Sequence, residues 1–169
     1  VTGVATPSLD ARLVNRLGFR TDIRRVPMFG LGCVAGAAGI ARVADYLRGN
    51  PDHVAVLLSV ELCSLTLQRA DLTIPNLIAT GLFGDGAAAV VGLGANRAAP
   101  TGVRVVDSRS RFYPDTERVM GWDIGVGGFQ IVLSAGVPDM VKDHMGDDVD
   151  RFLQMHDLTR DDIRHWICH

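Results

Sequence analysis

Several features that mark particular classes of protein are scarce in this sequence of 169 residues. No uninterrupted apolar run approaches the roughly 20 residues that a membrane-spanning helix needs. Seventeen basic residues face nineteen acidic ones, so no positive excess favours nucleic acid or an anionic membrane surface. Aromatic residues make up only 6%. We therefore expect no membrane span and no nucleic-acid partner.

Cysteine is also rare. The three cysteines, Cys33, Cys63 and Cys168, form an odd set without a CxxC pair. Such a set argues against a disulfide framework or a structural zinc site, and reduced thiols in a cytoplasm are the simpler interpretation. We expect a cytoplasmic protein without a metal site.

What the sequence does contain is typical of a globular protein, because 47% of it is apolar and 21% is charged. Apolar runs of strand length alternate with stretches of helical periodicity, which predicts an α/β fold. Helices are expected at 8–17, 33–48, 75–80, 137–145 and 148–156, with a further helix start at Thr159. Strands are expected at 53–60, 87–93, 103–107 and 166–168, the first two of them buried on both faces.

Both ends of the sequence are unusual for an intact domain. It begins without Met in a strand-like stretch, and it stops at the strand-like run Trp166-Ile167-Cys168-His169. We expect a fragment. The segment Gly94–Pro100 is the one linker-like stretch, and 122–128 is rich in glycine and prone to turns.

Cys33 lies in the run Gly30-Leu31-Gly32-Cys33-Val34-Ala35-Gly36, directly before a helix of small residues. Glycine inside a helix costs about 1 kcal/mol relative to alanine, so Gly36 and Gly39 indicate close approach of other backbone or of a substrate. A thiol at a helix N-terminus lies at the positive end of the dipole, which favours the thiolate. The pattern is that of a nucleophile. The alternative is a small buried apolar residue, the common fate of free cysteines and the interpretation we adopt for Cys63 and Cys168.

A second glycine turn, Phe83-Gly84-Asp85-Gly86, precedes an apolar run. It has neither the length nor the lysine of a phosphate-binding loop. Asp85 is expected to bind neighbouring main-chain N–H groups and to fix the turn. Phe83 either faces a cavity or belongs to the core.

A nucleophilic thiolate needs a partner for its charge. The candidates are the five histidines, His53, His144, His156, His165 and His169. His169 is preferred because it ends an expected strand, where α/β folds present catalytic groups.

These motifs resemble the chalcone-synthase-like (type III) polyketide synthases, which share the thiolase fold. The resemblance covers essentially the whole chain, and its most specific parts are 30–37, 82–89 and 166–169. The runs 59–65 and 107–110 resemble the actinobacterial and mycobacterial branch, whose members often make long-chain alkylpyrones. The resemblance implies an α/β thiolase-like αβαβα layered fold of which only the central portion is present. Residues 1–94 would be the later part of the N-terminal half, and 95–169 the start of the C-terminal half.

The resemblance also implies roles for three residues. Cys33 would carry the acyl and polyketide thioester, Phe83 would be the gatekeeping aromatic beside it, and His169 would pair with the thiolate. The family's third catalytic group, an asparagine, lies well downstream of a His-Pro-Gly-Gly-Pro run, and this sequence stops at the histidine. The site would therefore be incomplete here.

The sequence departs from the plant members at several positions. Ile131 falls at the second gatekeeper phenylalanine, although Phe129 is close by. Pocket positions that are threonine in plant enzymes are Thr2, Cys63 and Thr66 here. Thr6 falls where plant enzymes place a methionine that reaches into the partner subunit's cavity. Smaller side chains favour a long apolar starter.

The implied reaction is a decarboxylative Claisen condensation of an acyl-CoA with malonyl-CoA. Because small side chains are expected in the pocket, the acyl group is expected to be a long-chain fatty acyl. The reaction would give pyrone or resorcinol-type products, need no metal or organic cofactor, and be carried out by a homodimer. One alternative is a condensing enzyme similar to β-ketoacyl-[acyl-carrier-protein] synthase III, whose histidine is usually followed by Gln-Ala-Asn. The other is an inactive thiolase-fold partner.

Overall fold

The computed structural model describes residues 4–97 and 102–169 and divides the chain into two compact units. Unit 1 comprises residues up to Leu67 together with Leu82–Ser108, and unit 2 comprises Gln68–Gly81 and Arg109–His169. Each unit is described by itself. The expected division into halves at 94 and 95 refers to a whole protein and stays a prediction.

Unit 1 contains α1 (Leu9–Leu17), α2 (Ala35–Gly49), β1 (Val54–Glu61) and β2 (Gly86–Leu93). The first helix begins after Ser8 and ends at Gly18, which has a left-handed φ of 64°. These limits agree within one residue with the expected range 8–17, and a serine before a helix and a glycine after it are local signals of its ends, although the Ser8 side chain makes no capping hydrogen bond here. The second helix starts two residues later than expected, after a 3-10 turn at Gly32–Val34.

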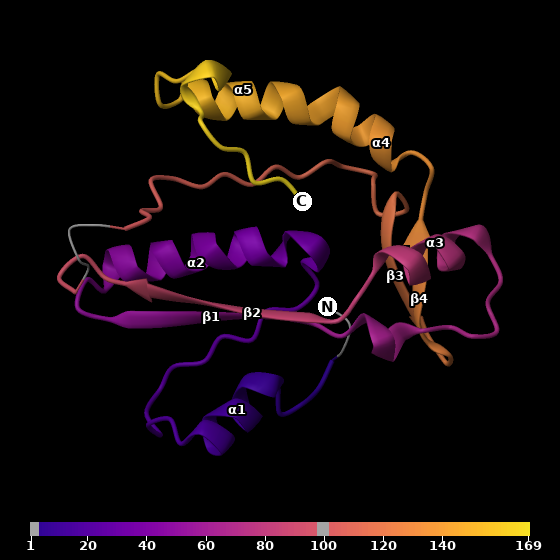
Figure 1. The fold of residues 1–169 in the computed structure, drawn as a ribbon, viewed down its shortest axis with the longest axis horizontal. Helices are drawn as coiled ribbons and strands as arrows, with labels where there is room; N and C mark the ends of the chain where they lie inside the picture. Colours follow the sequence, from indigo (N-terminus) through magenta and orange to yellow (C-terminus); the bar gives the residue numbers. More distant parts are fainter. Residues whose placement is uncertain (1–3, 98–101) are drawn as a thin grey trace. The chain divides into compact units, whose positions relative to one another are not determined.

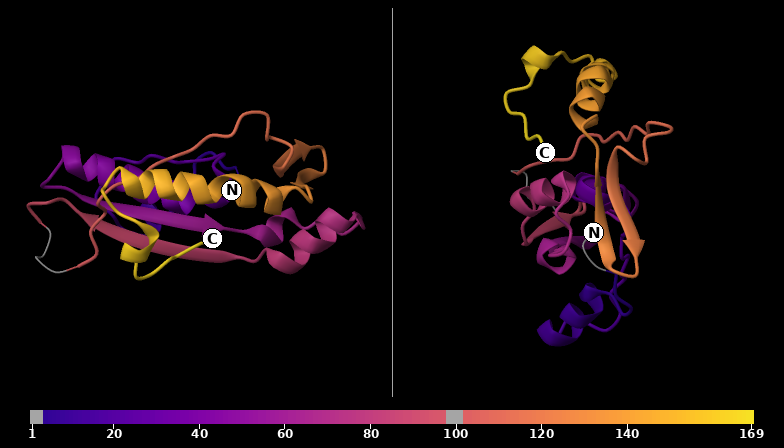
Figure 2. Two further views of the ribbon diagram at one scale, coloured as in Figure 1. Left: turned by 90° about the horizontal axis from the view of Figure 1, so that it is seen from above. Right: turned by 90° about the vertical axis from the view of Figure 1, so that its right-hand side faces the viewer.

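The two strands of unit 1 pair antiparallel, from Val54 opposite Leu93 to Glu61 opposite Gly86. Helix α2 lies along one face of this pair (Figures 1 and 2). Close packing marks that face: a Cβ added at Gly92 would lie 2.7 Å from Val43 and 2.8 Å from Leu47. The core of unit 1 lies between α2 and these strands.

The expectation that both strands are buried on both faces is wrong. Side chains alternate between the two faces of a strand, and α2 covers only one of them. Val54 and Val56 on β1 lie opposite Leu93 and Val91 on β2, and all four side chains are exposed. The apolar run predicted the strand correctly but could not tell which faces have neighbours.

Unit 2 contains α3 (Ile74–Leu82, whose last residue falls in unit 1), the hairpin β3 (Met120–Gly125) and β4 (Gly128–Leu133), and a helical run. The run consists of α4 (Val137–Met140), one π-helical turn (Val141–Met145) and α5 (Gly146–Gln154). The two helices expected here are therefore continuous. The glycine-rich stretch 122–128 is mostly strand, with its turn at Val126 and Gly127.

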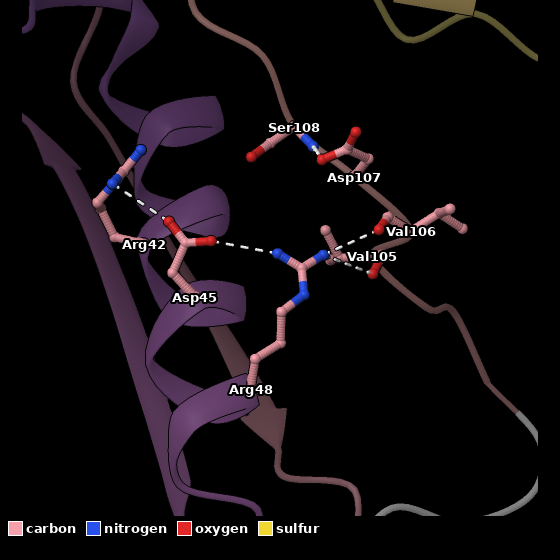
Figure 3. A network of polar contacts seen from close by, with 7 residues as sticks. All are labelled: Arg42, Asp45, Arg48, Val105, Val106, Asp107 and Ser108. Atoms are coloured by element: carbon pink, nitrogen blue, oxygen red, sulfur yellow. Dashed lines mark hydrogen bonds and ion pairs between the residues drawn. The ribbon is translucent and has the colours of Figure 1, made fainter. Parts of the chain in front are cut away.

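Two further strand predictions are wrong. Residues 103–107 and 166–168 form no strand in the described parts of the chain. An extended segment becomes a strand only when a neighbour pairs with it, which composition does not reveal. The first segment is held by a side chain: Arg48 on α2 donates to the carbonyl of Val106 at 2.9 Å (Figure 3). At Thr159, the expected helix start, a capping box is present and closes a single 3-10 turn, Arg160–Asp162.

Candidate active site

Cys33 lies in the 3-10 turn that leads into α2, and its thiol-bearing side chain is exposed. Gly30 and Gly32 before it have φ values of 88° and 55°, a left-handed conformation that side chains disfavour. The glycines thus make the turn that presents Cys33. Helix α2 has fifteen residues and no acidic residue in its first turn, so its dipole favours an anion at this end.

The glycines of α2 differ in their surroundings. Gly39 is buried, and a Cβ added there would lie 2.6 Å from Cδ1 of Leu57 on β1. Close packing on the sheet therefore explains this glycine, as expected. A Cβ at Gly36 would meet no atom within 4 Å in the described structure. Gly36, one turn from Cys33, leaves open space beside the cysteine.

Phe83 follows α3 directly and lies half-buried. Asp85 lies between Phe83 and β2. The prediction that it binds neighbouring main-chain N–H groups is wrong. Its carboxylate accepts hydrogen bonds from the main-chain N–H of Ser64 at 2.8 Å and from the Ser64 hydroxyl at 2.6 Å. Both bonds hold the pKa of Asp85 below its usual value, the hydroxyl bond contributing most.

Cys63 and Thr66 bound the 3-10 turn that contains Ser64. The Thr66 hydroxyl is buried and donates to the Cys63 carbonyl at 2.8 Å. Burial, Glu61 and Asp85, in that order, raise the pKa of the half-buried Cys63 thiol. Cys63 thus has the character of a neutral thiol, as its sequence context suggests. The interpretation of a small buried residue is wrong for Cys168, which is exposed.

The remaining predicted residues lie elsewhere. Thr2 is outside the described residues, and Thr6 is exposed on the approach to α1. Ile131 is half-buried on β4, opposite Trp122. His169 is exposed and belongs to no helix or strand, contrary to the strand expected there. Cys33, Cys63, Thr66 and Phe83 therefore belong to unit 1, whereas Ile131 and His169 belong to unit 2.

Sequence reasoning missed a cleft of about 380 Å³ in unit 2. Tyr113 forms one wall, stacks on the His144 ring at 4.7 Å and donates its hydroxyl to Asp148. Arg111 and Arg151 also line it. Apart from His144, one of the five candidate histidines, none of the predicted site residues lines the cleft. The groups come from 111–116 and 140–151, and no local motif links those segments.

Two features are absent from the described parts of the chain. Within 4–97 and 102–169, no three His, Cys, Asp or Glu side chains gather closely enough to hold a metal ion. In the same ranges, every helix is too short or too polar to cross a membrane.

Comparison with known proteins adds the family. Residues 1–97 match the model of the chalcone and stilbene synthases, N-terminal domain. The chain is 58% identical to a 1,3,6,8-tetrahydroxynaphthalene synthase of Streptomyces peucetius subsp. caesius. The alignment covers the whole of this chain and 45% of the length of that synthase. It thus spans less than half the length of that relative.

Solved structures agree with the family match. The crystal structure of 1,3,6,8-tetrahydroxynaphthalene synthase from Streptomyces coelicolor A3(2), a bacterial type III polyketide synthase, matches 92% of this chain with a TM-score of 0.85 and 36% identity, over 43% of its own length. PKS-I of the brown alga Ectocarpus siliculosus matches 98% of the chain with a TM-score of 0.90 and 32% identity, over 44% of its length. The fold is the thiolase-like α/β fold of these enzymes, and the chain belongs to the chalcone and stilbene synthase family.

Proposed function

We propose that the protein carrying this chain is a type III polyketide synthase and that Cys33 is its nucleophile. One observation carries the proposal: an exposed cysteine follows a left-handed glycine turn at the start of a long helix, in a chain of this family. The dipole of this helix favours an anion at its N-terminus, where Cys33 lies.

In the proposed reaction, the Cys33 thiolate attacks the carbonyl carbon of an acyl-CoA thioester and expels the CoA thiolate, which takes up a proton. Malonyl-CoA then loses CO₂ to give the enolate of acetyl-CoA. The enolate carbon attacks the Cys33 thioester, a carbon–carbon bond forms, and the Cys33 thiolate leaves. Rounds of this reaction lengthen the chain before it cyclises.

His169 is proposed to pair with the Cys33 thiolate and to donate to the thioester oxygen, with an asparagine from outside these residues as a second donor. Donors of this kind each contribute a few kcal/mol to transition-state stabilisation. Phe83 is proposed to face the acyl group. The chemistry needs no metal or organic cofactor. We propose a homodimer in the cytoplasm, because the family resemblance implies dimers and the cysteines suggest a reducing compartment.

For the starter, we propose a long-chain fatty acyl-CoA, which gives pyrone or resorcinol-type products. The support is the small size of Cys63 and Thr66 at proposed pocket positions, with Ile131 in place of a second phenylalanine. A second candidate product is 1,3,6,8-tetrahydroxynaphthalene, favoured by the 58% identity to a synthase of that compound. The two differ chemically, because a fatty acyl starter leaves an alkyl tail and this naphthalene has none.

The test uses the longest polypeptide encoded in frame with residues 1–169, with labelled malonyl-CoA alone or with a fatty acyl-CoA added. Alkylated labelled products that require the fatty acyl-CoA support the first candidate, and the tetrahydroxylated naphthalene from malonyl-CoA alone supports the second. Cys33→Ala is expected to abolish both, and Cys168→Ala is the matched control. Wild-type product rates in Cys33→Ala would overturn the assignment of the nucleophile.

A hybrid keeps the test informative if that polypeptide is silent. In it, this chain replaces the 58% identical part of the Streptomyces peucetius synthase. Product from the hybrid, lost in Cys33→Ala, supports the proposed chemistry. A folded hybrid without product argues against it and favours an inactive partner. Carrier-protein-dependent condensation would instead point to the ketoacyl synthase alternative.

A further inference from the structure

The pairing of β1 with β2 ends at Glu61 and Gly86, and the chain continues beyond both residues into segments with proposed roles in the site. After Glu61 comes the turn from Cys63 to Thr66. Immediately before Gly86 comes Phe83-Gly84-Asp85. Beyond the end of the main-chain ladder, a side-chain contact also joins these two segments.

The Asp85 carboxylate supplies that contact. One oxygen accepts the main-chain N–H of Ser64 at 2.8 Å, and the other accepts the Ser64 hydroxyl at 2.6 Å. Two charge-assisted bonds to one residue restrain both its backbone and its side-chain rotamer. The residues are 21 positions apart, so the contact joins distant parts of the chain.

The turn held in this way is closed internally. The buried Thr66 hydroxyl donates to the Cys63 carbonyl at 2.8 Å, so the residues on both sides of Ser64 move with it. On the other strand, Asp85 is separated from Phe83 by a single residue. The Ser64–Asp85 bridge is therefore a direct link between the segment of Phe83 and the turn of Cys63 and Thr66.

We propose that Asp85 is a positioning residue that, through Ser64, sets the separation between Phe83 and the Cys63–Thr66 turn and thereby the shape of the acyl-binding site. This inference rests on the proposed function. Both partners of the bridge are exposed, so its contribution to overall stability is small and its effect is local. The lowered pKa of Asp85, caused chiefly by the Ser64 hydroxyl, agrees with a formed bridge.

The experiment compares Asp85→Ala and Ser64→Ala with wild type in the longest polypeptide encoded in frame. Asp85→Asn is the conservative variant, because its amide oxygen can still accept the Ser64 N–H. Asp71→Ala is the matched control: Asp71 also accepts a main-chain N–H, that of Thr73 at 2.9 Å, but is half-buried and lies in unit 2. Each variant is assayed for KM of the starter, kcat and product length, and its thermal midpoint is measured.

We expect Asp85→Ala to lower kcat/KM for the starter on the order of tenfold or more and to shift product length, because a misplacement of about 1 Å can cost on the order of a hundredfold. Ser64→Ala is expected to change kcat/KM for the starter and product length in the same direction. Asp85→Asn is expected to recover part of the kcat/KM that Asp85→Ala loses. Asp71→Ala is expected to keep kcat/KM within about twofold of wild type. Thermal midpoints should remain close to that of wild type. Wild-type starter kinetics and products in Ser64→Ala and Asp85→Asn overturn the proposal, even if Asp85→Ala does not fold.

Failure of the proposed function can be told apart from failure of the positioning role of Asp85. A wild-type protein that forms no polyketide contradicts the function. The placement is then tested in the chain of 169 residues by the alkylation rate of Cys63. Ser64→Ala is expected to raise that rate by loosening the turn while the Asp85 charge stays in place, and Asp71→Ala to leave it unchanged. An unchanged rate in Ser64→Ala overturns the positioning role.

Discussion

The guanidinium of Arg48 donates a 2.9 Å hydrogen bond to the carbonyl of Val106, which lies 58 residues further along the chain (Figure 3). The same guanidinium donates to Asp45 on α2 at 3.1 Å. Arg42 pairs with the other Asp45 oxygen at 3.2 Å. Arg48 therefore fastens the segment around Val106 to the helix that begins beside Cys33.

Replacing Arg48 with alanine should release this segment. The side chain is 47% exposed, so solvent screening limits the loss of unfolding free energy to about 1 kcal/mol. Hydrogen-exchange mass spectrometry should show faster exchange in residues 103–108. Arg42→Ala is the matched control, because it loses its ion pair with Asp45 but not a contact to Val106. Equal exchange in the two variants would contradict the anchoring role.

The two glycines of α2 provide a second test. Gly36→Ala should raise the free energy of unfolding by about 0.5–1 kcal/mol, because alanine favours helix and the added Cβ meets open space. Gly39→Ala should lower it by about 1–2 kcal/mol, because the Cβ would lie 2.6 Å from Cδ1 of Leu57. Denaturant titration measures both. In a Leu57→Ala background the penalty at Gly39 should vanish; if it persists there, crowding is not its cause.

The limits of sequence reasoning follow from the same contacts. Ser8, Gly18 and Gly32 act within one or two turns of their own position, and the sequence predicted the structure around them. The burial of β1 could not be predicted, because it depends on what covers each face. The partner of Asp85 is 21 residues away, and the glycine turn around it contains no sign of Ser64.

The candidate site divides in the same way. The turn and helix around Cys33 are local features and were predicted to within two residues. His169 was chosen because a strand was expected before it, and that strand is not formed in the described structure. Its catalytic role therefore stays a prediction that rests on the family resemblance.

Tyr113 and Asp148 should show coupled pH dependence. The bond from the Tyr113 hydroxyl raises the pKa of Tyr113 and lowers that of Asp148. Because the pKa of Asp148 is lower in the folded state, its carboxylate stabilises the fold above the unfolded pKa of about 4. This stability is lost as the pH falls through the folded pKa. A phenol with a raised pKa contributes below about 10, and its contribution is lost as pH rises through the folded pKa.

Tyr113→Phe should therefore move the pKa of Asp148 upward, as followed by carboxyl-carbon NMR. Near-ultraviolet absorbance should show that the phenol lost in this variant ionises above the usual pH range of tyrosine. Tyr46→Phe is the control, since the Tyr46 hydroxyl lies 2.8 Å from His53 and does not bind Asp148. If the pKa of Asp148 is the same in Tyr113→Phe as in wild type, the hydrogen bond from the Tyr113 hydroxyl to Asp148 is absent in solution.

Cys63 should react more slowly with iodoacetamide near neutral pH than Cys168, whose side chain is exposed. Burial, Glu61 and Asp85 raise the pKa of Cys63, and the thiolate is the reacting species. The difference should narrow as pH rises through the Cys63 pKa, and peptide mass spectrometry can follow each thiol. Glu61→Gln should speed the reaction at Cys63, because it removes a nearby negative charge. Asp123→Asn is the control, since Asp123 pairs with Arg118 in unit 2. If Cys63 and Cys168 reacted at the same rate at every pH, the neutral thiol assigned to Cys63 would be wrong.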